Sequence, residues 1–265
     1  MITKFSRIDG DSNHRAKIAF GGVGKAGWNA IDSYRLYCGD FLYGTELVAF
    51  TYPSEKADDH NKEILRRTLH GFDWIYIAVD LMEEHALEDA CECAELLRSD
   101  NEKTRTELFC VVIEQNTEAP VAEVLLQHYN KVFFVQHPTQ MSIPVEMVRA
   151  VGNGRNMVGA DYVDLFSTIS PHKLIYVLQE KCANIQLLGD TARKLAGKLI
   201  LRHNHNDDVT IVVQAGMDCS LDAYESVCYD LMQYVDENAK TFLFAYYNAE
   251  EHDMSAAVTV MLCAD

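Results

Sequence analysis

The sequence contains no apolar run that approaches the roughly 20 residues needed to cross a bilayer. It is also poor in positive charge: 23 lysines and arginines stand against 40 aspartates and glutamates, a formal net charge of −17. Proteins that bind nucleic acid need clustered cations to displace counterions from phosphates, so no nucleic-acid partner is expected. An anionic membrane surface is disfavoured for the same reason. Small ligands and proteins remain as partners.

Export signals and cysteine motifs are missing as well. Residues 1–11 are polar and contain no signal-peptide core, which predicts a cytoplasmic protein. The eight cysteines are therefore expected to be reduced thiols. Cys91 and Cys93 lack the two-residue separation of a zinc or redox motif, and Cys110 and Cys263 lie in apolar runs that predict core packing. We predict no metal site, and interpret the polar stretches 83–88 and 203–208 as solvated.

The first half of the chain alternates short apolar strands with helices. Strands are predicted over residues 16–20, 46–52, 74–79, 108–113 and 131–135, and helices over 28–37, 62–69 and 83–98. Strands that are apolar throughout are buried on both faces. This pattern predicts an α/β fold with a Rossmann-like parallel sheet in a doubly wound domain.

A stretch containing glycine and asparagine, residues 151–159, is expected to join two domains, 1–155 and 156–265. The second is predicted to be a smaller α/β domain with a mixed sheet. Its amphipathic helix over 221–235 has Ser220 placed as N-cap. The core face of that helix is predicted from helical spacing: Leu221, Tyr224, Val227, Cys228, Leu231 and Val235.

A glycine turn between the first strand and helix carries the main chemical signal. Gly22, Gly24 and Gly27 fit the Gly-x-Gly-x-x-Gly pattern, whose backbone N–H groups can approach a phosphate at a helix N-terminus. A dinucleotide site also requires an acidic residue at the end of the second strand, which binds the ribose. Residues 50–53 contain no acidic residue. A Walker A motif needs Ser or Thr at the position of Ala26. A tight turn without any ligand stays open as the alternative.

Four segments resemble a known family. Residues 209–227 resemble the activation-domain segment of FtsZ, with a strand, Ala-Gly-x-Asp and an acidic helix start. Residues 156–170 resemble the FtsZ synergy loop and the helix after it, and residues 22–30 resemble its first glycine loop. Together with residues 72–78 they follow the family's order along the chain. The resemblance to the FtsZ/tubulin superfamily implies a nucleotide-binding domain followed by an activation-type domain.

The departures from the family concern its phosphate site. In the family, the strand that corresponds to residues 74–79 leads into the Gly-Gly-Gly-Thr-Gly-Thr-Gly loop around the triphosphate. Here the aligned residues, 82–88, are bulky and include Glu83, Glu84 and Glu88. A carboxylate a few ångströms from a phosphate costs several kcal/mol unless a cation intervenes. The resemblance thus implies that no cofactor is bound, or that GTP or GDP binds only if the site still works.

The resemblance also assigns candidate site residues. Asp161 and Asp164 correspond to carboxylates that act in trans on the nucleotide of the next subunit, although Gly159 replaces the asparagine of that loop. The alternative role for the two aspartates is capping of the following helix. If nucleotide binding is retained, its contacts would be Gly22, Gly24, Lys25, Gly27 and Asn29.

Three functional hypotheses follow. The first is a pseudo-GTPase of cytoskeletal or cell-division type, which acts by contact with itself or with an FtsZ/tubulin-type protein. The second is a polymerising GTPase in which Lys25 supplies charge to the phosphates. The third, an NAD(P)-dependent oxidoreductase, is disfavoured because the ribose carboxylate is missing.

Overall fold

The computed structural model describes residues 2–5, 17–37, 46–52, 59–101, 106–114, 119–152, 156–158, 162–202, 207–247 and 254–264. Its contacts divide the chain into two units, Met1–Arg149 and Ala150–Asp265. The division falls inside helix α5 (Ile143–Gly152). None of the helices in the described ranges combines the length and hydrophobicity that a membrane span requires.

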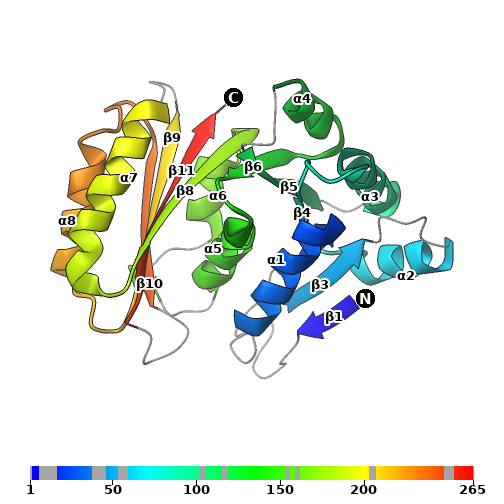
Figure 1. Ribbon diagram of the computed structural model, residues 1–265, viewed down its shortest axis with the longest axis horizontal. Helices are drawn as coiled ribbons and strands as arrows, with labels where there is room; N and C mark the ends of the chain where they lie inside the picture. Colours follow the sequence, from blue (N-terminus) through cyan, green and yellow to red (C-terminus); the bar gives the residue numbers. More distant parts are fainter. Residues whose placement is uncertain are drawn as a thin grey trace. The chain divides into compact units, whose positions relative to one another are not determined.

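The first unit is built on a sheet with the strand order β1-β3-β2-β4-β5-β6 (Figure 1). Its strands are β1 (Ile2–Phe5), β2 (Lys17–Val23), β3 (Glu46–Tyr52), β4 (Trp74–Val79), β5 (Glu107–Ile113) and β6 (Lys131–Val135). All neighbours run parallel except β1, which is antiparallel to β3. Almost every residue of β2, β4, β5 and β6 is buried. The parallel sheet predicted from the apolar strands is therefore confirmed.

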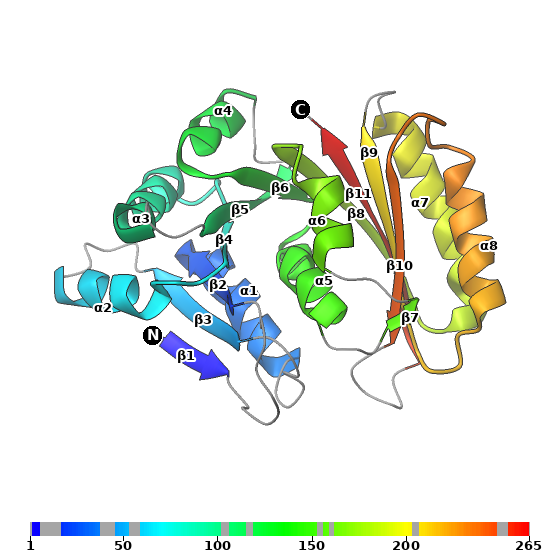
Figure 2. The same ribbon diagram turned by 180° about the vertical axis from the view of Figure 1, so that it is seen from behind.

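The helices of this unit lie on both faces of the sheet (Figures 1 and 2). They are α1 (Gly24–Tyr37), α2 (Asp59–Leu69), α3 (Ala86–Asn101) and α4 (Ala119–His128), with the short helix η2 (Pro138–Gln140) before α5. Right-handed crossovers place α1, which leads from β2 out to β3, on one face. The other three, whose connections run the opposite way across the sheet, lie side by side on the second face.

The second unit has a mixed sheet of order β8-β11-β9-β10-β7. Its elements are β7 (Asn156–Val158), α6 (Tyr162–Ile169), β8 (Leu174–Cys182), η3 (Ile185–Leu187), α7 (Leu188–Arg202), β9 (Asp208–Ala215), α8 (Leu221–Met232), β10 (Thr241–Tyr247) and β11 (Ala256–Ala264). β9 and β10 are parallel, whereas β11 is antiparallel to both β8 and β9. The mixed α/β sheet expected for this part of the chain is therefore present.

Helix α8 confirms its predicted start and corrects its predicted core face. The Ser220 hydroxyl accepts a hydrogen bond from the N–H of Ala223 at 3.2 Å, as an N-cap does. Tyr224, Val227, Cys228 and Leu231 are buried. Leu221 instead is 53% exposed. Leu221 is the first residue of α8 after the N-cap Ser220, and its side chain is not covered by the core that buries the later residues.

Replacing Ser220 with alanine should lower the free energy of unfolding by about 1 kcal/mol, because an N–H at the start of α8 loses its acceptor. Chemical denaturation followed by circular dichroism measures the change. Ser226→Ala, on the exposed side of the same helix, is the control and should change stability by less than about 0.5 kcal/mol. An equal decrease in the free energy of unfolding for both variants would contradict the assignment of Ser220 as the N-cap of α8.

Candidate functional site

The candidate site lies where β2, β3 and β4 end. The parallel register aligns the last residues of these strands, Val23, Tyr52 and Val79, at one edge of the sheet. The chain leaves β2 towards α1 on one face and leaves β4 towards α3 on the other. Such a change of direction between neighbouring strands is the switch point at which open α/β sheets bind ligands. The glycine turn and the segment after β4 meet there.

The glycine turn is shorter than the sequence predicts. Strand β2 continues to Val23, because it pairs with β3 and β4 along its whole length. Helix α1 begins at Gly24, not at Trp28 as predicted. Gly24 has φ = 69°, which glycine adopts without steric cost. Lys25, Ala26 and Gly27 therefore form the first turn of α1, and no free loop remains to wrap a ligand.

Two of the glycines are needed for packing alone. A Cβ on Gly22 would lie 2.3 Å from the carbonyl oxygen of Gly27, and a Cβ on Gly27 would lie 2.4 Å from the carbonyl oxygen of Ala78 in β4. The start of α1 thus rests directly on the backbone of β2 and β4. This close approach explains Gly22 and Gly27 whether or not a phosphate binds.

Gly24 faces a carboxylate. A Cβ at this position would lie 2.3 Å from Oε2 of Glu83. The same oxygen accepts a hydrogen bond from the backbone N–H of Lys25 at 2.7 Å. The N–H groups at a helix N-terminus are the ordinary partners of a phosphate. In this protein a side chain from the segment after β4 takes that position.

The segment after β4 forms a turn that brings Glu83 to α1. The N–H of Met82 donates to Oδ1 of Asp80 at 3.0 Å, and the N–H of Glu83 donates to the Asp80 carbonyl at 3.2 Å. His85 then takes a left-handed conformation with φ = 62°. Helix α3 begins only at Ala86, so the predicted helix start at residue 83 is wrong. The Asp80 side chain supplies an acceptor within the turn, and the Glu83 side chain joins the turn to α1.

The three glutamates of this segment have different surroundings. Glu83 is half-buried against α1. Glu84 and Glu88 are exposed, and their carboxylates lie 3.5 Å and 3.1 Å from the ring nitrogens of His85. All three glutamates were expected to take the place of the phosphate-wrapping glycines, but only Glu83 lies at the glycine turn. Its charge favours the positive N-terminus of α1 and not that of α3.

Further carboxylates lie beyond the end of β3. Burial raises the pKa of the Tyr52 hydroxyl well above its ordinary value, and nearby Cys93 and Glu92 add to the rise. Burial also raises the pKa of Asp89. A hydrogen bond from Lys62 lowers the pKa of Glu92 and joins α2 to α3. No sequence pattern selects Tyr52, Asp89 or Glu92, because their proximity depends on how α3 packs.

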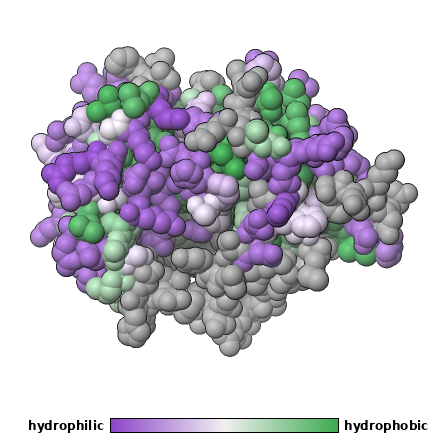
Figure 3. All heavy atoms as spheres, viewed as in Figure 1, coloured by the Kyte–Doolittle hydropathy of each residue, from purple (hydrophilic) through white to green (hydrophobic). Residues whose placement is uncertain are grey.

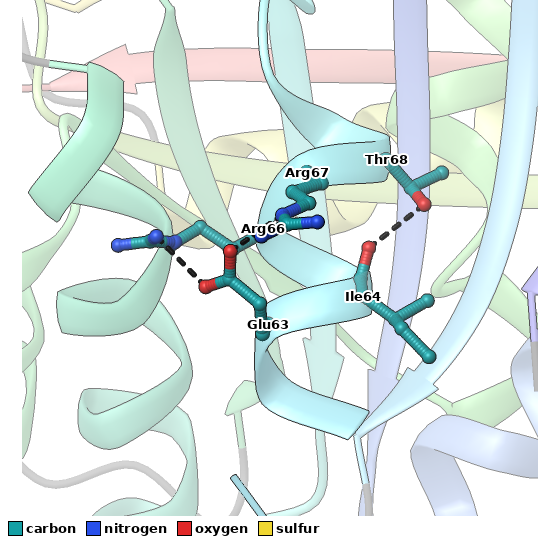
Figure 4. A network of polar contacts seen from close by, with 5 residues as sticks. All are labelled: Glu63, Ile64, Arg66, Arg67 and Thr68. Carbon is teal, nitrogen blue, oxygen red and sulfur yellow. Dashed lines mark hydrogen bonds and ion pairs between the residues drawn. The ribbon is translucent and has the colours of Figure 1, made fainter. Parts of the chain in front are cut away.

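The two arginines of α2 form ion pairs with a glutamate of their own helix. Glu63 lies between Arg66 and Arg67, with its two carboxylate oxygens 2.7 Å and 2.6 Å from their guanidinium nitrogens (Figure 4). Thr68 donates to the carbonyl of Ile64 one turn earlier at 2.8 Å. Pairs three or four residues apart are natural neighbours on a helix surface. These two arginines therefore form ion pairs on the surface of α2.

The structure places three of the other four predicted site residues on exposed helix surfaces. The side chains of Lys25 and Asn29 are exposed on α1. Asp164 is exposed in the first turn of α6, and Asp161 lies outside the described residues. The trans-acting role of the two aspartates stays a prediction. Within the described ranges no group of three or more His, Cys, Asp or Glu is arranged to hold a metal ion.

The polar stretch 203–208 is described only at its end. Asp208 accepts from the N–H of Lys240 at 2.9 Å, and its other oxygen lies 3.0 Å from Nε2 of His172. These contacts join the starts of β9 and β10 to the turn before β8. Asp208 therefore has a structural role in the second unit.

The residues at the switch point do not fit a phosphate group. A phosphate at the start of α1 would need the N–H that Lys25 donates to Glu83 and the space beside Gly24 that the carboxylate fills. It would also lie next to a negative charge. At 4 Å, two unit charges at an effective dielectric constant of 20 repel by about 4 kcal/mol. A phosphate at the start of α1 would therefore have to displace the Glu83 carboxylate.

The architecture nevertheless matches known structures. No family profile and no curated protein matches the sequence. An FtsZ mutant from M. jannaschii superimposes with a TM-score of 0.69 at 15% identity, over 94% of this chain and 91% of its own. A GTPγS-bound CetZ2 protofilament from Haloferax volcanii gives 0.64 at 12% identity, over 94% and 93%. CetZ from Methanosaeta thermophila gives 0.62 at 10% identity, over 95% and 87%. The chain thus has the fold of the FtsZ/tubulin superfamily.

Proposed function

We propose that this protein is a cytoplasmic, cytoskeletal FtsZ/tubulin-like protein that has lost GTPase activity and acts through protein–protein contacts. The observation that carries the proposal is the 2.7 Å hydrogen bond from the N–H of Lys25 to the carboxylate of Glu83. The chain's own anion occupies the position that a nucleotide phosphate would need. Lys25, which could have compensated for lost glycines, has its backbone donor engaged and its side chain in solvent.

Its partners are copies of itself or another FtsZ/tubulin-type protein. Among the structures with this fold are an FtsZ dimer from M. jannaschii and the CetZ2 protofilament. Two proteins with this fold thus associate with copies of themselves, and we propose the same for this chain. The excess of negative charge favours neutral or basic protein surfaces as partners.

The nucleotide content of the purified protein tests this proposal. Denaturation should release no guanine nucleotide, and GTP hydrolysis by the isolated protein should not exceed the rate in buffer. The physical reason is that binding would have to displace Glu83 from Lys25 and then tolerate its charge. Stoichiometric guanine nucleotide would favour the GTPase hypothesis, and an adenine dinucleotide would favour the oxidoreductase.

A further inference from the structure

The outer layer of the second unit consists of two parallel helices. β8, β9 and β10 run in one direction, because β11 is antiparallel to both β8 and β9 and β10 is parallel to β9. α7 connects β8 to β9, and α8 connects β9 to β10, so both helices run back along the sheet in the same sense. They pack against each other on one face of the sheet (Figures 1 and 2).

The two helices carry opposite charge. α7 contains Arg193, Lys194, Lys198 and Arg202 against Asp190, a formal charge of +3. α8 contains Asp222, Glu225 and Asp230 with no lysine or arginine, a formal charge of −3. No other described helix is as basic as α7, in a chain whose net charge is −17. Arg193, Lys194, Asp222 and Glu225 are exposed.

Large apolar side chains are exposed at both ends of this face. At the ends where the helices start they are Leu187, Met217 and Leu221, and at the ends where they finish they are Ile200, Leu201 and Tyr229. All except Leu187 are more than half exposed. In Figure 3, the part of the surface over α7 and α8 shows separate hydrophobic groups on a hydrophilic background. Singly exposed apolar residues are ordinary on a protein surface, so the charges of the two helices carry the argument for a contact surface.

We propose that this face binds the same face of a second copy of the chain, with a two-fold axis parallel to the helices. Such an axis keeps the direction of each helix and exchanges their positions, so α7 of one copy lies on α8 of the other. The basic helix then meets the acidic helix twice, as an isologous interface requires. The apolar groups at the starts meet each other, and so do those at the ends. A two-fold axis perpendicular to the helices, in the plane of the interface, would instead place α7 of one copy on α7 of the other. The two basic helices would then repel each other.

Charge-reversal variants test this arrangement. Variant A, Arg193→Glu with Lys194→Glu, makes both helices acidic, and variant B, Asp222→Lys with Glu225→Lys, makes both basic. Sedimentation velocity over a dilution series should show a dimer for the wild-type chain. For each variant alone the dissociation constant should rise by about 100-fold or more, because each change acts at two symmetry-related contacts. An equimolar mixture of A and B should dimerise again, because both contacts regain opposite charge.

The mixture also excludes a folding defect, because two misfolded chains would not restore a dimer. Glu88→Lys, an exposed reversal on α3 of the other unit, is the control and should leave the dimer unchanged. A monomeric wild-type chain at every concentration, a dimer that both variants retain, or no dimer in the A–B mixture would overturn the proposal. None of these results depends on nucleotide, so the proposal can fail or succeed independently of the pseudo-GTPase assignment.

Discussion

Replacing Gly27 with alanine should lower the free energy of unfolding of the first unit by about 3 kcal/mol. The added Cβ would lie 2.4 Å from the carbonyl oxygen of Ala78 and 3.0 Å from the backbone of Gly22. All of these atoms belong to the backbone of packed strands, so no side chain can rotate away. Overpacking of this kind costs about 1–3 kcal/mol, and a backbone contact belongs at the upper end. Both tryptophans, Trp28 and Trp74, lie in this unit, so their fluorescence during urea denaturation reports the loss.

The matched control is Gly197→Ala, the same substitution inside another helix. Apart from the neighbouring residues and backbone of α7 itself, no described heavy atom lies within 4 Å of a Cβ at Gly197. Alanine is the better helix former by about 1 kcal/mol, so circular dichroism should show equal or greater stability. If Gly27→Ala were tolerated equally well, α1 would not rest on the backbone of β4, and Gly27 would need a ligand-based explanation.

Replacing Glu83 with alanine should have a double effect. It removes the acceptor of the Lys25 N–H and a negative charge at the start of α1, which should cost about 1–2 kcal/mol. It also frees the anion position, so inorganic phosphate or sulfate should now raise the midpoint of thermal unfolding. The wild-type protein should show no such specific response, because its own carboxylate fills the position.

Glu84→Ala is the control for this variant, because Glu84 is the adjacent glutamate and its side chain is 91% exposed. It should leave both the stability and the response to phosphate as in the wild-type chain. Equal behaviour of the two alanine variants would show that Glu83 does not hold the start of α1.

The sequence predicted the sheet well because its strands are apolar on both faces. Residues 74–79 and 131–135 were predicted with the boundaries that the structure has, because polar residues lie at or next to the ends of each apolar run. The short strand β1 and the helices α4 and α5 were not predicted.

The site was predicted less well, for a physical reason. Gly24 and Glu83 are 59 residues apart, and their contact depends on the switch in direction between β2 and β4. The glycine pattern predicted a loop over residues 21–27, whereas β2 continues to Val23 and Glu83 caps α1, which begins at Gly24. The sequence therefore identified the negative charge after β4 but not the helix, α1, whose start it stabilises.

Calorimetric titration of the wild-type protein and of Glu83→Ala with GTP in magnesium buffer tests the central claim most directly. The wild-type chain should give no saturable binding, because Glu83 occupies the N–H of Lys25 and the space beside Gly24. Any affinity for GTP should arise only when Glu83 is removed. Micromolar binding of GTP to the wild-type chain, unchanged in Glu83→Ala, would contradict the assignment of Glu83 as the anion that replaces the nucleotide phosphate.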